Sequence, residues 1–80
     1  MQLQILAFGI ARDIVGNSKI SFQLEKGQTV KDLKAALVKQ FPDFQQLVSL
    51  SIAVNTEYAM DDHLLKESDE IVIIPPVAGG

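Results

Sequence analysis

The sequence has no cysteine and no long apolar run. Without cysteine the chain can form no disulfide, no thiolate nucleophile and no zinc–thiolate site, which fits the reducing cytoplasm. No apolar run approaches the roughly 20 residues that a membrane-spanning helix needs. The first residues, MQLQILAFG, lack the basic segment of a secretory signal. We therefore expect a cytoplasmic protein with no membrane partner.

Positive charge is also scarce, because seven basic side chains stand against ten acidic ones and the net charge is -3. Binding to a phosphate backbone requires clustered lysine and arginine, so we expect no nucleic-acid partner. The charge is unevenly divided: residues 1–42 carry six basic and three acidic side chains, whereas residues 43–80 carry one and seven. The last expected strand therefore lies in the acidic half.

Side chains suited to catalysis are few. The one histidine, His63, follows Asp61 and Asp62, but three adjacent side chains cannot all converge on one metal ion. A solvated turn with an aspartate cap is the favoured interpretation. No serine, lysine or tyrosine lies in a nucleophile motif, and no glycine-rich loop follows a strand to hold a phosphate. We expect no metal, no bound cofactor and no catalysis by the chain alone.

Hydrophobic residues make up 48% of the 80 residues, which is enough for one domain over residues 1–80. Alternating apolar residues, such as Leu3, Ile5 and Ala7, predict strands. The expected strands cover residues 2–8, 19–25, 51–55 and 70–75, with a brief further pairing at 58–60. The strand at 70–75 is nearly all apolar, which is typical of the middle of a sheet. Gly16 and Asn17 are turn residues and predict a long hairpin between the first two strands.

One main helix is expected after these strands. Thr29 can cap it, with Asp32 as a weak capping box. The apolar stripe that follows at helical spacing ends at Pro42 and consists of Val30, Leu33, Leu37 and Phe41. Residues 43–50 are expected to form a polar loop, and residues 61–69, DDHLLKESD, a single helical turn.

The expected order is β-β-α-β-(β)-β, an α+β arrangement. One helix between a hairpin and later strands suggests a mixed sheet with the first and last strands parallel neighbours and the helix packed on one face. This is the ubiquitin-like β-grasp fold. A ferredoxin-like β-α-β-β-α-β fold would need a second real helix, for which residues 61–69 are too short.

The chain ends in IIPPVAGG. Pro75 and Pro76 cannot donate ladder hydrogen bonds, so they should end the last strand and project residues 75–80 as a flexible tail. Beyond the prolines the tail is narrow enough to thread a channel in a partner, because it consists of Val77, Ala78, Gly79 and Gly80. The α-carboxylate of Gly80 is inert until activated, but joining it to AMP would create a good leaving group that a sulfur or nitrogen nucleophile can displace.

Three stretches resemble the small, sulfur-carrying subunits of molybdopterin synthase: LAFGIARDIVG (residues 6–16), AVN (53–55) and DEIVIIPPVAGG (69–80). The first has an F-x-x-x-R-x-x-x-G spacing typical of that family, and the last is highly specific. Two departures are Ser68, where glycine is frequent, and the pair Ile73 and Ile74, where aromatic residues are frequent. Neither departure touches the expected reactive end.

The resemblance implies that Gly80 is adenylated by an ATP-dependent activating enzyme, which alone uses ATP, and is then thiocarboxylated. A sulfur donor protein would supply the sulfur. Residues 75–80 would enter the large synthase subunit and give sulfur to cyclic pyranopterin monophosphate, and the two subunits would form a heterotetramer. The chain would then be the sulfur-carrying part of a sulfurtransferase complex. Three alternatives stay open: a thiamine-pathway sulfur carrier, a ubiquitin-like protein modifier, and a β-grasp module that only binds partners.

A partner surface is expected on the sheet face away from the helix. If the first and last strands are parallel, Phe8 and Ile74 are neighbours at the end where the tail departs, and both have the parity opposite to Leu3 and Ile5. Tyr58 is expected beside them and Arg12 is a fourth candidate. The competing interpretation places Phe8 in the core, where phenylalanine is often found.

Overall fold

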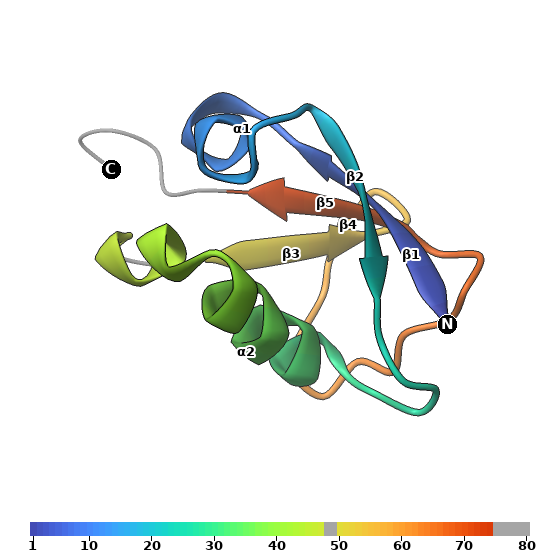
Figure 1. Cartoon of the computed structure of the whole chain (residues 1–80). Coiled ribbons are helices and arrows are strands. Elements are labelled where there is room, and N and C mark those ends of the chain that lie inside the picture. Colours follow the sequence, from blue (N-terminus) through green and yellow to red (C-terminus); the bar gives the residue numbers. More distant parts are fainter. Residues whose placement is uncertain (48–49, 75–80) are drawn as a thin grey trace.

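The computed structural model describes residues 1–47 and 50–74, which form a five-stranded mixed sheet with helices on one face (Figure 1). The strand order is β2-β1-β5-β3-β4. The strands are β1 (Gln2–Ala7), β2 (Lys19–Gln23), β3 (Ser51–Val54), β4 (Glu57–Tyr58) and β5 (Glu70–Ile74). The helices are α1 (Gly9–Val15), α2 (Val30–Gln40) and the 3₁₀ helix η1 (Pro42–Gln46).

The central pairing agrees with the sequence prediction. β1 and β5 are parallel neighbours, with Ile5 opposite Ile71 and Ala7 opposite Ile73. The pairs β1–β2, β3–β4 and β3–β5 are all antiparallel. This is the β-grasp arrangement, in which the first and last strands form the middle of the sheet.

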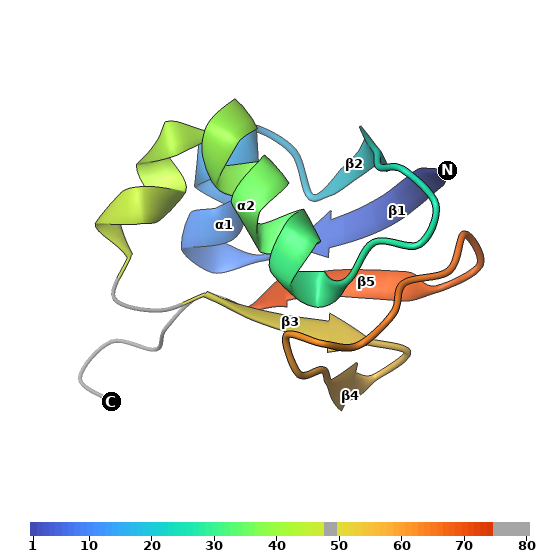
Figure 2. The same cartoon turned by 90° about the horizontal axis from the view of Figure 1, so that it is seen from below.

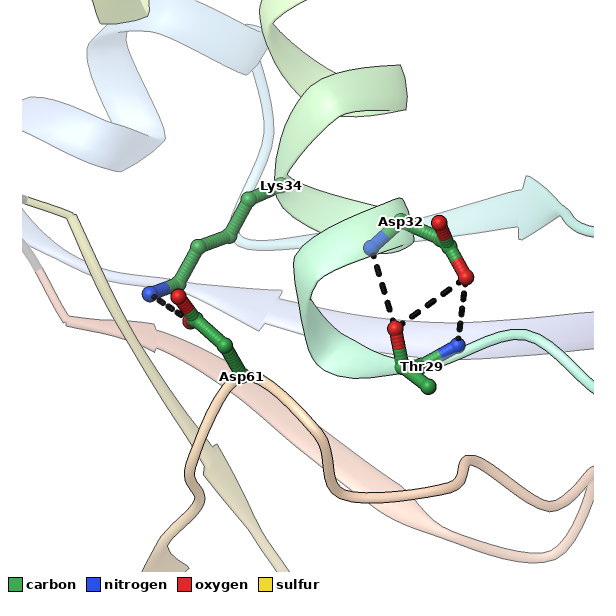
Figure 3. Close-up of polar contacts among 4 residues, drawn as sticks. All are labelled: Thr29, Asp32, Lys34 and Asp61. Carbon is green, nitrogen blue, oxygen red and sulfur yellow. Dashed lines mark hydrogen bonds and ion pairs between the residues drawn. The ribbon is translucent and has the colours of Figure 1, made fainter.

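The main helix begins as predicted. The Thr29 backbone N–H donates to Asp32 Oδ2 at 2.9 Å, and the Asp32 N–H donates to Thr29 Oγ1 at 3.4 Å, which completes a capping box (Figure 3). Three stripe residues, Val30, Leu33 and Leu37, are fully buried. The helix ends before Phe41, because Pro42 cannot continue it.

Residues 9–18 are not a plain hairpin connection as expected, because they contain α1. Its burial follows helical spacing, with Ala11 buried and Ile14 and Val15 half-buried against the core. Gly16 ends the helix in the left-handed conformation at φ 85°, and its N–H donates to the Arg12 carbonyl at 2.8 Å. The sequence did carry this end signal, but seven residues present too little periodicity to predict a helix.

Two further expectations are wrong. Residues 61–69 form turns at 61–62 and 67–68 and an isolated bridge from Leu64 to Thr29, with no helical turn. The expected polar loop after Pro42 contains η1, whose Phe44 is buried and meets Phe41 edge to face, with ring centroids 6.2 Å apart. Proline at the first position of η1 favours this extra turn.

The core lies between the sheet and the helices. α1, α2 and η1 contribute buried side chains to one cluster with β1 and β5, which contribute Leu3, Ile5, Ile71 and Ile73. The helices α1 and α2 lie on the same side of the sheet (Figure 2). We call this side the covered face and the other side the open face.

Candidate functional site

The register of the strands decides which residues lie on the open face. Residues opposite each other in a sheet share a face, and successive residues alternate. Leu3, Ile5, Ile71 and Ile73 are fully buried on the covered face. Their neighbours in sequence therefore point to the open face.

One end of the open face is apolar. Leu6 lies opposite Val72, Val72 opposite Ala53, and Ala53 opposite Tyr58. These residues form a continuous row across β1, β5, β3 and β4. Together with Ile74 and Phe8 they make up what we call the open-face patch: Leu6, Phe8, Ala53, Tyr58, Val72 and Ile74. The patch lies along the second half of β5, the last described strand, where Ile74 faces Ser51 of β3. Ala53 is only 7% exposed, so the accessible part of the patch comes from its other residues.

Phe8 reaches this patch because it lies between β1 and α1. It has extended dihedral angles and is the N-cap residue of α1, and its carbonyl accepts the Ala11 N–H at 3.1 Å. Since Ala7 lies opposite Ile73, continuing the register places Phe8 beside Ile74. Phe8 is 55% exposed, so the competing interpretation of a core residue is wrong. That it binds a partner stays a prediction.

The other candidate interface residues are also accessible. Tyr58 is 73% exposed on β4, and Ile74 is half-buried at the end of β5. Arg12 is exposed on α1 rather than on a hairpin loop. Sequence reasoning missed Leu6, Ala53 and Val72, because only the cross-strand register brings them beside the predicted residues.

The opposite end of the open face is polar. There Gln4 lies opposite both Ser21 and Glu70, and its Nε2 donates to Ser21 Oγ at 3.1 Å. A hollow of about 310 Å³ lies along this end, lined by Gln4, Leu6, Lys19, Glu67, Ser68, Asp69 and Glu70. Leu6 joins the hollow to the open-face patch, so the face changes from polar to apolar toward the end of β5.

The predicted solvated turn with its aspartates contains an ion pair. Lys34 Nζ lies 2.8 Å from Asp61 Oδ1 (Figure 3). The hydrogen bond from Lys34, and then its positive charge, lower the pKa of Asp61. His63 is exposed, and its backbone carbonyl accepts the Val30 N–H at 3.0 Å. Within residues 1–47 and 50–74, no group of three or more His, Cys, Asp or Glu side chains is placed to hold a metal ion.

Two of the motifs that carry the family resemblance meet in space. Asn55, which ends the AVN motif, donates from Nδ2 to Asp69 Oδ1 at 2.9 Å, and Asp69 begins the DEIVII motif. Sequence reasoning treated both only as parts of motifs, because nothing in a separation of 14 residues indicates a contact.

The predicted reactive tail, comprising Pro75, Pro76, Val77, Ala78, Gly79 and Gly80, lies outside the described residues. No helix in the described part of the chain is long and apolar enough to span a membrane.

Comparison with known proteins identifies the family. The sequence model of the ThiS family matches residues 5–80. The chain is 34% identical over 83 residues to the molybdopterin synthase sulfur carrier subunit of Chlamydomonas reinhardtii, and the match covers 100% of both chains.

Solved structures agree with this assignment. A Pyrococcus furiosus protein described as a candidate molybdopterin converting factor, subunit 1, superposes with a TM-score of 0.86 at 27% identity, covering 96% of this chain and 99% of that one. A chain in the complex of subunits 1 and 2 of the Helicobacter pylori molybdopterin-converting factor superposes with a TM-score of 0.66 at 25% identity, covering 100% of both chains. These likenesses confirm the ubiquitin-like β-grasp fold. The chain therefore belongs to the ThiS family and is a homologue of molybdopterin synthase sulfur carrier subunits.

Proposed function

We propose that this protein is the sulfur-carrying small subunit of a molybdopterin synthase and that it acts in the cytoplasm. The observation that carries the proposal is the 34% identity to a named sulfur carrier subunit over the full length of both chains. The proposed chemistry uses the carboxylate of Gly80 in the PPVAGG segment.

The proposed reaction takes place at the Gly80 carboxylate. A carboxylate oxygen attacks the α-phosphorus of ATP on a separate activating enzyme, and pyrophosphate leaves. A hydrosulfide ion (HS⁻) delivered by a donor protein then attacks the carbonyl carbon and displaces AMP, and loss of the S–H proton leaves a thiocarboxylate. In the large synthase subunit this sulfur is transferred to cyclic pyranopterin monophosphate, and hydrolysis of the bond between carbon and sulfur restores the carboxylate. The described side chains take no chemical part.

The described residues would instead bind the partner and aim the tail. The open-face patch includes Ile74, the residue after which residues 75–80 follow in sequence, so a protein that covers the patch would contact the chain where the tail begins. An exposed apolar patch with a polar surround is typical of a binding surface. The complex of two molybdopterin-converting factor subunits from Helicobacter pylori supports a large subunit as this partner. The heterotetramer is what the family resemblance implies, and we propose it on that ground alone.

The alternatives share the fold but not the product. A thiamine-pathway carrier would pass the same thiocarboxylate to another acceptor, a protein modifier would form an amide with a lysine, and a binding module would undergo no change. The Phe8 and Arg12 segment and the double proline favour the molybdopterin assignment over the thiamine one.

The test is intact mass spectrometry of the chain incubated with the activating enzyme, ATP and a sulfur donor, followed by addition of the large subunit and cyclic pyranopterin monophosphate. We expect the mass of the chain to rise by the difference between one sulfur and one oxygen atom. Molybdopterin should then form after the second addition. The control variant lacks Gly80 and should fold normally but gain no sulfur. A protein adduct on lysine would instead identify a modifier, and an unchanged mass in the intact chain would contradict the proposal.

A further inference from the structure

The register of β5 is poorly specified by its own side chains. After Glu70 the strand is entirely apolar, with Ile71 and Ile73 fully buried and Val72 and Ile74 half-buried. A slip by one residue would exchange the two faces. Because Val72 and Ile74 would then enter the core in place of two isoleucines, the loss of apolar burial would be small. The opposite slip would bring Glu70 into the core in place of Ile71, so the hydrophobic pattern opposes a slip in one direction only.

Asn55 and Asp69, which we call the clamp, form hydrogen bonds that fit one register of β5. The Asn55 backbone N–H donates to the Glu70 carbonyl at 2.9 Å, and the Glu70 N–H donates to Asn55 Oδ1 at 2.9 Å. Asn55 Nδ2 donates to Asp69 Oδ1 at 2.9 Å, while Asp69 Oδ2 accepts the Lys66 N–H at 2.8 Å. Each donor meets an acceptor in one alignment, and a slip by one residue breaks the contacts to Glu70.

The backbone conformation of Asn55 and the burial of Asp69 both favour this hydrogen-bonded arrangement of the clamp. Asn55 has a φ of 53° in the turn between β3 and β4, a conformation that asparagine tolerates better than most residues. Asp69 is 8% exposed, so its carboxylate is removed from most competing water. Unpaired polar groups at such a site are costly, which makes any other alignment of β5 unfavourable.

We infer that Asn55 and Asp69 are positioning residues that set the register of β5 and thereby the point at which the chain leaves the sheet beside Phe8. Each residue of slip would move that point by about 3.3 Å. It would also exchange Ile74 for a neighbour on the open face. Sulfur transfer requires the chain end to reach a fixed place in the partner. This last step rests on the proposed function, whereas the register claim does not.

A reciprocal exchange tests the clamp. The D69N variant replaces a carboxylate oxygen by an amino group that must face either the Lys66 N–H or the Asn55 amino group, both of which are donors. The N55D variant places two carboxylates against each other. In the double variant N55D/D69N the new carboxylate accepts from the Glu70 N–H and from the new amide, whose oxygen accepts from the Lys66 N–H. All three side-chain hydrogen bonds are then restored.

Two measurements are needed on the full chain. Cross-strand nuclear Overhauser effects report the register directly: Ile52 with Ile73 and Val54 with Ile71 in the native alignment, and partners shifted by one residue after a slip. Sulfur-transfer kinetics with the large subunit report the consequence. We expect shifted contacts in both single variants and a fall in kcat of about tenfold or more, because misplacement of a reacting group by a few ångström is costly. The double variant should recover both readouts.

The matched control is Thr56→Gly, which changes the same turn without touching the clamp and should keep the register and the transfer rate. If both single variants keep the native cross-strand contacts, the inference is overturned whatever their activity. If they lose stability but the double variant does not recover the register, the clamp is not the cause. Failure of the native chain to accept sulfur would overturn the proposed function and leave the register result standing.

Discussion

The two faces of the sheet are built from alternate residues of the same strands, yet they differ in composition and in burial. The covered face is uniformly apolar and closed by α1, α2 and η1. The open face changes along its length, from Gln4, Ser21 and Glu70 at one end to the open-face patch at the other. Burial on the first face stabilises the fold, whereas the second face retains apolar area that no described helix or strand covers.

The largest effect is expected on the covered face. Phe22 is 5% exposed on β2, opposite Leu3. We expect Phe22→Ala to lower the free energy of unfolding by about 3–5 kcal/mol, because it removes a ring from a packed core. Urea denaturation measures this change. The exposed neighbour variant Gln23→Ala should stay within about 0.5 kcal/mol of the native protein. Equal losses in the two variants would contradict the division into faces.

Phe8→Ala is the matching change on the open face. The exposed ring contributes little to folding, but truncation of a central interface residue commonly costs about 2 kcal/mol of binding. We expect weaker affinity for the large subunit with nearly unchanged unfolding, measured by calorimetry and urea denaturation on the same samples. Unchanged affinity with a strongly lowered stability would contradict a role for Phe8 in binding the partner.

A smaller effect is expected at the start of the helix that closes the covered face. Thr29→Ala removes the side-chain acceptor for the Asp32 N–H, and loss of such a cap costs about 1 kcal/mol. Thermal denaturation should show this loss, while affinity for the partner should not change. Gln40→Ala, at the far end of α2, is the control. A stability equal to that of the native protein would mean that the cap contributes nothing.

The smallest effect is expected from the ion pair that lies on neither face. Lys34 lowers the pKa of Asp61 in the folded protein, so the pair adds stability above the unfolded pKa of about 4 and loses it as the pH falls through the folded pKa. The stability difference between the native protein and Asp61→Asn should therefore be small at pH 7 and vanish in acid. It should also shrink in high salt, since both groups are accessible. A difference that grew on acidification would refute this assignment.

Short-range pattern was enough to predict much of the fold. The spacing of Val30, Leu33 and Leu37 predicted α2, and Thr29 and Asp32 predicted its start. Apolar alternation predicted β1, and a nearly continuous apolar run predicted β5. Pattern failed for α1 and η1 because each is about two turns or less, and helices of that length depend on packing rather than on propensity. The turns of residues 61–69 were mistaken for a helical turn for the same reason.

The candidate site, like the fold, was predictable from the sequence only in part. The sequence by itself predicted the reactive end from covalent order. Given parallel first and last strands, the two-residue repeat of a strand also predicted that Phe8 and Ile74 share a face. Only the tertiary structure decided that Leu6, Val72, Ala53 and Tyr58 form one row and that Asn55 meets Asp69. These contacts depend on the register between strands distant in sequence, and register is fixed by the combined packing and hydrogen bonding of the whole sheet.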